Sequence, residues 1–227
     1  MIMTETSLHA ALKTWYAQPG DSIETIVDGY IIDIRHGDTL IEIQTRNFSS
    51  LRIKLEKLLA HYPVRLLYPI AVEKWIVHQE NGSTTRRRKS PKHGRTEHMF
   101  NELVYIPHLL NNSNFSLQIL FTEEEETWVK AGGGSWRRKG WRIADRRLIG
   151  ILGTQEFCTI DEYRNLVPAN MPETFTTSDL ARQAHLSHRL AQKMAYTLRA
   201  SEIIKVNRRV NRSYEYHLNQ LEPDAGS

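Results

Sequence analysis

Two carboxylates and an amide stand in a β-rich stretch, Val27 to Thr45, at positions where apolar strand residues would be expected. These residues are Asp33, Glu42 and Gln44. Carboxylate oxygens are preferred ligands of hard divalent cations, so two carboxylates on neighbouring strands could share one such ion. The chemistry to expect here is therefore that of a metal site.

The stretch reads as a β-hairpin, because two Ile-rich alternating segments flank His36-Gly37-Asp38. A two-residue turn at His36-Gly37 would place Asp33 opposite Leu40 and diagonal to Glu42, whereas a turn at Gly37-Asp38 would place Asp33 directly opposite Glu42. Either turn leaves Asp33, Glu42 and Gln44 on one face. Cross-strand neighbours lie roughly 4.5 to 8 Å apart, which suits a shared cation.

A strand Asp, a hairpin and then Glu-x-Gln in an Ile-rich strand resembles the core of the PD-(D/E)xK restriction-like nucleases. The last motif position in that superfamily is usually Lys and sometimes Gln. The resemblance implies phosphodiester hydrolysis with Mg²⁺ or Mn²⁺ held by Asp33 and Glu42, a water positioned by Gln44, and positive charge from Lys54 on the following helix. The segment EIQTRNFSSLRIKLEKLLAHYPVRLLYPI is also similar to uncharacterised bacterial proteins that join such a core to a winged helix.

Two other interpretations of the same residues stay open. Polar residues on a hairpin are often only its solvated face, although Ile41 and Ile43 beside Glu42 indicate a central strand. The core could also derive from a nuclease and be inactive, because Gln44 replaces the usual lysine.

The flanking sequence predicts an α/β order of elements, and the resemblance implies a restriction-endonuclease-like mixed sheet with flanking helices. Leu8, Ala11, Leu12, Trp15 and Tyr16 recur at helical spacing before Pro19, and Thr4 to Ser7 offer N-caps. A second helix should begin at Asn47 and end before Pro63. Strands are expected at Val64 to Ile70, over EKWIVHQE, and at Phe115 to Phe121. Nuclease cores of this kind often carry an additional acidic residue on a first helix, so the resemblance makes Glu5 and Glu24 candidates for it.

Basic residues are clustered rather than dispersed, as expected of a protein that binds a polyanion. The run RRRKSPKHGR, Arg86 to Arg95, is predicted to be a loop and either a solvated segment or a DNA clamp. A second segment, Trp136 to Arg142, mixes aromatic and basic side chains and could stack on bases or form a packed hairpin. Glu123 to Glu126 is interpreted as an acidic cap that keeps an edge soluble. The DNA-binding candidates of the two basic segments are Arg86, Arg87, Arg88, Lys89, Lys92, Arg137, Arg138 and Lys139.

The last third of the chain resembles a winged helix-turn-helix domain. Thr176 or Thr177 should cap one helix and Ser187 a longer one, and IIKVNRRVNRSYEYHL reads as two strands around a basic tip. A basic outward face on the second helix fits the major groove of DNA, although some winged helices contact protein instead. The candidates on the helix are His188, Arg189, Gln192, Lys193 and Tyr196, and those on the wing are Arg208, Arg209 and Arg212.

Composition sets broad limits on the class of protein. The 227 residues carry a formal net charge of +4 and one cysteine, Cys158, which excludes an intrachain disulfide and fits a reducing cytoplasm. No segment reads as a membrane span or a signal peptide. The expected organisation is a nuclease-like domain over 1–130, a basic segment and helical connector over 131–172, a winged helix over 173–220 and a disordered tail over 221–227. Ile149 to Val167 is the expected helical connector.

The function expected from these patterns is a metal-dependent DNA endonuclease held on double-stranded DNA by its winged helix. It could act as a homodimer or with protein partners in a mobile-element or defence complex. The alternative is a catalytically inactive DNA-binding regulator or assembly subunit built on a nuclease-derived scaffold.

Overall fold

The computed structural model describes residues 7–80, 82–130, 140–210 and 213–219. The chain forms two compact units that are interleaved along the sequence. Unit 1 comprises residues 1–46, 61–96 and 117–156, and unit 2 comprises residues 47–60, 97–116 and 157–227. The expected organisation placed its divisions in sequence order, at residues 130 and 172, whereas each unit here is assembled from separated segments.

Unit 1 is built on a large mixed sheet of seven strands, so the chain has a mixed α/β fold with helices flanking a sheet. The strand order is β1-β2-β3-β4-β6-β7, and β5 pairs with β4. All neighbouring pairs with a defined register are antiparallel except β3 with β4, which is parallel. The strands are β1 (Ser22–Val27), β2 (Tyr30–His36), β3 (Thr39–Ile43), β4 (Val64–Glu80), β5 (Ser83–Lys89), β6 (Phe115–Lys130) and β7 (Trp141–Phe157).

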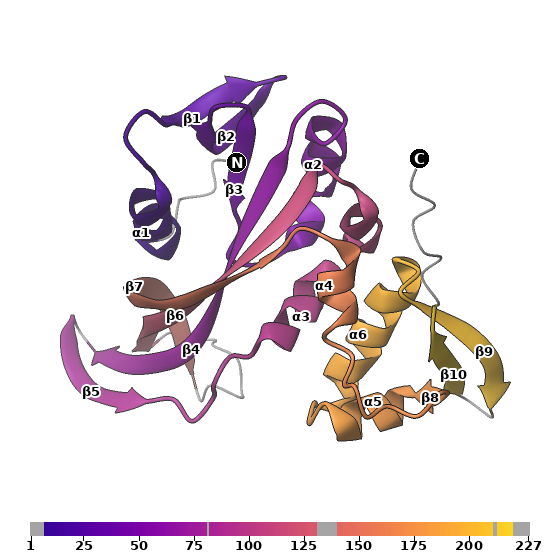
Figure 1. Ribbon diagram of the computed structural model, residues 1–227. Coiled ribbons are helices and arrows are strands. Elements are labelled where there is room, and N and C mark those ends of the chain that lie inside the picture. The colour runs from indigo at the N-terminus through magenta and orange to yellow at the C-terminus, as the bar shows by residue number, and fades with distance from the viewer. Residues whose placement is uncertain (1–6, 81, 131–139, 211–212, 220–227) are drawn as a thin grey trace. The chain divides into compact units, whose positions relative to one another are not determined.

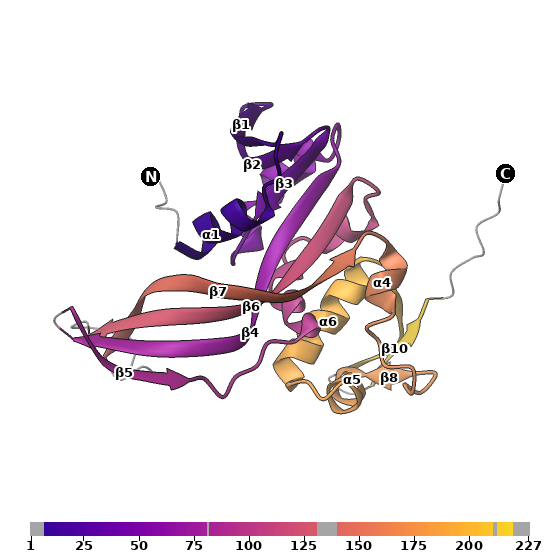
Figure 2. The ribbon, with the colours of Figure 1, turned by 60° about the vertical axis from the view of Figure 1, so that its left-hand side comes forward.

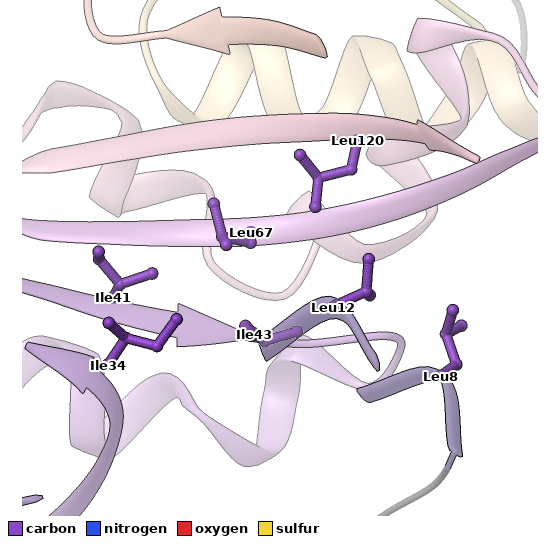
Figure 3. Packing of buried hydrophobic residues seen from close by; sticks show 7 residues of the cluster. All are labelled: Leu8, Leu12, Ile34, Ile41, Ile43, Leu67 and Leu120. Carbon is purple, nitrogen blue, oxygen red and sulfur yellow. The ribbon is translucent and has the colours of Figure 1, made fainter. Parts of the chain in front are cut away.

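Helix α1 (Ser7–Tyr16) covers one face of this sheet, as its apolar spacing predicted. Leu8 and Leu12 are fully buried and pack with Ile34, Ile41, Ile43, Leu67 and Leu120 from four strands (Figure 3). The shared helical spacing predicted a buried position for Trp15 as well, and this was wrong: its side chain is 48% exposed. It lies at the margin of the helix face, while Tyr16 is partly buried against the cluster.

Three strands of unit 1 are far longer than the sequence patterns indicated. β4 runs unbroken through both predicted strands, Val64 to Ile70 and EKWIVHQE. Its first residues pair with β3 and its last with β5, so one strand serves two partners along the same edge. Figure 2 shows β4, β6 and β7 extending side by side beyond β3, with β5 along β4.

Two secondary-structure predictions were wrong in this extended part of the sheet. The basic run begins as strand β5 rather than as a loop, because Arg86, Arg87 and Arg88 pair with His78, Val77 and Ile76 of β4. The segment Ile149 to Val167 is not a helical connector over its whole length. It is strand β7 as far as Phe157 and then the short helix α4 (Ile160–Arg164).

Unit 2 contains the two helices expected in the last third of the chain, the helix expected after Asn47, and further short helical elements among its described residues. Helix α6 (His188–Ala200) packs against α5 (Thr177–Gln183), α3 (Phe100–Leu103) and η3 (Pro107–Asn111). The small sheet of unit 2 has the strand order β8-β10-β9. Asn47 precedes the 3₁₀ turn η1 in a left-handed conformation without a side-chain cap, so the predicted N-cap was wrong. The elements are η1 (Phe48–Ser50), α2 (Arg52–Leu58), η2 (Thr96–Met99), α3 (Phe100–Leu103), η3 (Pro107–Asn111), α4, β8 (Phe175–Thr176), α5 (Thr177–Gln183), α6 (His188–Ala200), β9 (Ile204–Val210) and β10 (Ser213–Leu218) (Figure 1).

The caps of the two principal helices are those that the sequence predicted. Thr176 and Asp179 form a capping box at α5, and the Ser187 hydroxyl accepts a hydrogen bond from the backbone N–H of Leu190 at α6. The apolar stripe of α6 is buried and comprises Leu190, Ala191, Met194, Ala195 and Leu198. None of the helices among the described residues is long and apolar enough to cross a membrane.

Candidate functional site

The register of β2 with β3 shows which of the two predicted turns is present. His36 pairs with Thr39 and Ile34 with Ile41, so the turn is Gly37-Asp38. Continuing this register by one residue sets Asp33 opposite Glu42, which is the closer of the two predicted arrangements. Directly opposed residues in such a pair have Cβ atoms about 4.5–5.5 Å apart.

The Asp33 carboxylate reaches the backbone beside Glu42. Its Oδ2 accepts a hydrogen bond from the Ile43 N–H at 2.8 Å, just beyond the last paired residues of the two strands. The same oxygen lies 3.3 Å from Nε2 of His9 on α1. The Asp33 side chain therefore adds a hydrogen bond between β2 and β3 where their backbone pairing ends, and it also contacts α1 through His9.

Glu42 occupies a central position, as its apolar neighbours indicated. It pairs with Leu66 of β4 on one side of β3, continues the β2 register on the other, and is only 3% exposed. A charged carboxylate is costly to bury unless it is paired, hydrogen-bonded or bound to a cation. This burial argues against a merely solvated polar face at Glu42.

Gln44 directly follows β3 and extends its pairing with β4. Its backbone N–H donates to the Leu67 carbonyl at 2.9 Å, which fixes where the half-buried amide side chain leaves the strand. Lys54, the predicted source of positive charge, is half-buried on α2 and belongs to unit 2. Its role stays a prediction.

His9 was not among the predicted site residues, and Glu24 was a candidate without an assigned role. His9 follows the buried Leu8 on α1, and a polar residue bordering an apolar stripe is too common a pattern to have marked it. Glu24 lies in β1 with a left-handed φ of 51° and accepts a hydrogen bond from Lys13 at 2.6 Å. Glu5 lies outside the described residues. Within the described part of the chain, no group of three or more His, Cys, Asp or Glu residues could hold a metal ion.

The predicted DNA-binding residues of β5 lie in different surroundings. Arg87 donates to Glu125 at 2.8 Å, and Lys89 pairs with Glu73 at 2.8 Å. Arg86 is exposed and Arg88 half-exposed. Lys92 lies in the segment after β5, where its backbone N–H donates to the Ser90 hydroxyl. Arg137, Arg138 and Lys139 lie outside the described residues.

The acidic run Glu123 to Glu126 is not a soluble cap at an edge, so this interpretation was wrong. It lies inside β6, where Glu124 is fully buried and Glu126 is 6% exposed. Arg146 of β7 donates to Glu124, and Lys74 of β4 donates to Glu126. Successive glutamates point to opposite faces of the sheet, and each is matched by a donor on a neighbouring strand.

On unit 2, the outward face of α6 is largely as predicted. His188, Arg189, Gln192 and Tyr196 are exposed. Lys193 differs, because its ammonium group donates to the backbone and side-chain oxygens of Asn101 at 3.1 Å. These hydrogen bonds hold the Lys193 side chain against α3 of the same unit.

The two strands predicted for the wing are present as β9 and β10, which pair antiparallel. Arg208 and Arg209 lie in β9, and Arg208 donates to Glu215 of β10 at 2.8 Å. Arg212 and the neighbouring Asn211 lie outside the described residues. Arg209 is exposed, and its charge has no ion pair among the described residues.

Comparison with known proteins identifies the family. The model of the family described as "Domain of unknown function (DUF8091)" matches residues 6–158, and the chain belongs to this family. A protein of Treponema pallidum (strain Nichols) named "Uncharacterized protein" is 34% identical over 179 residues, which span 78% of this chain and 71% of that protein. No solved structure matches. The family match ends beside Phe157, the last residue of β7, so it includes Asp33, Glu42 and the whole large sheet.

Proposed function

We propose that this member of the DUF8091 family is a metal-dependent DNA endonuclease with a restriction-like core and a C-terminal winged helix that binds duplex DNA. The observation that carries the proposal is the meeting of Asp33 and Glu42 across β2 and β3. One carboxylate is buried in a central strand, and the other is fixed to the adjoining backbone at 2.8 Å. Such a core would cut phosphodiester bonds of DNA in the cytoplasm, alone, as a homodimer or within a larger complex.

The donor set at this site suits Mg²⁺ or Mn²⁺, because both ions favour carboxylate oxygens. Asp33 and Glu42 would hold the ion. When bound, such an ion lowers the pKa of a water and neutralises charge on the scissile phosphate. Asp33 is oriented by the Ile43 N–H and His9, Gln44 can orient a water through its amide, and Lys54 is the proposed cation for the developing charge.

The arrangement of α5, α6, β9 and β10 supports the proposed winged helix. A tight turn joins two capped helices, and a two-stranded hairpin follows the second helix. Helix α6 exposes Arg189 near its first turn, where a recognition helix reaches base edges. The polar and basic outward face fits the major groove of duplex DNA.

One observation favours the alternative, a DNA-binding protein without catalysis. Asp33 already has two partners within the fold, the Ile43 N–H and His9, so its carboxylate would be explained by a structural role alone. Gln44 in place of lysine points in the same direction. A direct test of metal binding separates the two functions.

We expect millimolar Mg²⁺ or Mn²⁺ to raise the melting temperature of the protein by several degrees. An ion that binds only the folded state at 100 times its Kd contributes about 2.7 kcal/mol, and 1 kcal/mol corresponds to about 2–4 °C for a chain of this size. Asp33→Asn should lose the shift, because the amide keeps an acceptor for the Ile43 N–H but removes the charge. Asp38→Asn, in the exposed turn, is the matched control and should keep it. A wild-type melting curve unaffected by either ion would contradict the metal site.

Removing the exposed arginines of α6 and β9 should weaken duplex binding in a salt-dependent way. Each lost phosphate contact should reduce the slope of log affinity against log salt by about 0.9, so Arg209→Ala is expected to flatten it by about one. Arg189→Ala should instead reduce discrimination between sequences by about 1–3 kcal/mol if it contacts guanine. Arg182→Ala is the control, because Arg182 on α5 is paired with Asp179 at 2.5 Å. Fluorescence anisotropy with labelled duplexes measures all three, and unchanged binding by Arg189→Ala and Arg209→Ala would favour a protein-contact role.

A further inference from the structure

The part of the large sheet beyond β3 has two faces of different chemistry. Successive side chains of a strand point to opposite faces, and the register of β4 with β5 assigns each residue to one of them. Trp75 and Val77 of β4 lie on the same face as their partners Lys89 and Arg87. Ile76 and His78 lie on the other face with their partners Arg88 and Arg86. We name these the Trp75 face and the His78 face.

The side chains of the Trp75 face form hydrogen bonds, ion pairs and a cation–π contact with one another. The indole N–H of Trp75 donates to Glu123 at 2.7 Å, and the guanidinium of Arg87 lies 3.9 Å from the centre of the Trp75 ring. Arg87 and Arg147 both donate to Glu125, at 2.8 and 2.9 Å. The aromatic surface is covered and the positive charges are neutralised, so this face is occupied with its own contacts.

Three aromatic rings form a group on the His78 face. The His78 and Trp141 rings are 4.4 Å apart and inclined by 32°, and the Trp128 ring lies edge-on to His78 at 5.6 Å. All three side chains remain partly exposed. They come from three different strands, β4, β6 and β7, so the sheet brings them together from distant parts of the sequence.

The ring of Trp128 is held in position by a hydrogen bond to Glu126, which forms an ion pair with Lys74. Its indole N–H donates to Glu126 Oε2 at 3.0 Å, and Lys74 donates to Glu126 Oε1 at 2.6 Å. Burial opposes ionisation of Glu126, but the hydrogen bond and charge of Lys74 leave the pKa of this carboxyl below its usual value. A side chain fixed in this way loses little entropy when a ligand stacks on it.

Two positive charges border the rings. Arg86 lies directly opposite His78, and Arg88 lies opposite Ile76 on the same face. Burial, followed by the charges of Arg88 and Arg86, lowers the pKa of His78, which favours the neutral imidazole. Neither arginine has an ion pair among the described residues, in contrast to Arg87 and Lys89 on the opposite face. The His78 face therefore offers three aromatic rings beside two guanidinium groups that form no ion pair within the described part of the chain.

We infer that the His78 face binds single-stranded DNA, with unpaired bases stacking on Trp128 and Trp141 and the backbone phosphates contacting Arg86 and Arg88. Aromatic rings beside basic side chains are the usual means of binding single strands, because every base has a face that can stack. Bases of a duplex are already stacked and cannot reach such rings. The inference rests on the proposed function for its ligand, DNA, and deepens it: the substrate would contain a single-stranded segment next to the duplex.

The test is the binding of a labelled oligothymidylate of about 20 nucleotides to the full chain in EDTA, where no metal-dependent cleavage occurs. Arg86→Ala and Arg87→Ala form a matched pair, because both are exposed neighbours on β5 that face opposite ways. We expect Arg86→Ala to weaken binding several-fold and to flatten the salt dependence by about 0.7, the value for one phosphate of a single strand. Arg87→Ala should leave binding unchanged. Trp128→Ala should weaken binding by about 5- to 100-fold, the loss of one stacked base.

The outcomes separate this inference from the proposed nuclease activity. Equal losses for Arg86→Ala and Arg87→Ala would overturn the proposed single-strand site on the His78 face, even if the protein cuts DNA. Wild-type affinity in both Arg86→Ala and Trp128→Ala would do the same. Binding that depends on Arg86 and Trp128 would support it even if no cleavage is found. If Trp128→Ala fails to fold, as judged by circular dichroism, the double variant Arg86→Ala/Arg88→Ala replaces it, because truncating these arginines breaks no ion pair among the described residues.

Discussion

We expect Glu42→Gln to abolish DNA cleavage while leaving DNA affinity unchanged or slightly tighter. A carboxylate that holds a divalent ion contributes through that ion several kcal/mol of charge stabilisation in the transition state, which is about a thousandfold in rate. The substitution conserves the volume of a side chain that is only 3% exposed, so the fold should survive. Removing a negative charge beside a phosphate also relieves repulsion in the bound state.

The measurement is single-turnover cleavage of duplex, nicked and partly single-stranded DNA with Mg²⁺ or Mn²⁺, together with binding of the same substrates. Asp38→Asn provides the control, because it makes the same change of charge in the exposed turn of the same hairpin. If the wild-type protein cuts none of these substrates, and Glu42→Gln binds them all as the wild type does, the non-catalytic DNA-binding function becomes the better explanation.

Local signals in the sequence were sufficient for the hairpin and for helices α5 and α6 of unit 2. Alternation and a turn residue specify β2 and β3, and Thr176 and Ser187 carry their capping function in their own side chains. These features depend on neighbours a few residues away, which a sequence displays directly. The choice of turn, by contrast, depended on one residue of register, and the alternating pattern alone left both possibilities open.

The parts that were predicted wrongly depend on partners distant in the sequence. In the sequence, a run of three arginines is typical of a solvated loop. In the structure, these residues pair with β4, and Glu125 neutralises the charge of Arg87. The residues of β7 mix spacings of two and four, with Ile149, Ile151 and Leu152 close together, so apolar periodicity did not separate a strand from a helix. Exposure along β7 nevertheless alternates over most of its length, as expected of a strand, with breaks at Asp145-Arg146 and Gly150-Ile151.

The acidic run of β6 gives the largest expected effect on stability. The Glu124 side chain is fully buried, and its Oε2 accepts hydrogen bonds from Nε and Nη2 of Arg146 at 3.1 and 2.7 Å. Its other oxygen accepts from the Thr122 hydroxyl at 2.8 Å. Truncating one partner of a buried ion pair leaves an uncompensated charge, which typically costs about 3–5 kcal/mol.

We therefore expect Arg146→Ala to lower the free energy of unfolding by about 3–5 kcal/mol, measured by urea denaturation. Arg147→Ala should cost less than about 1 kcal/mol, because Arg147 is 64% exposed and Arg87 still donates to the shared Glu125. The two arginines are adjacent on β7 and face opposite sides of the sheet, so they form a closely matched pair. A double variant, Glu124→Gln/Arg146→Met, should recover much of the loss, since it removes both charges together. Equal costs for Arg146→Ala and Arg147→Ala would show that the buried pair does not stabilise this part of the sheet.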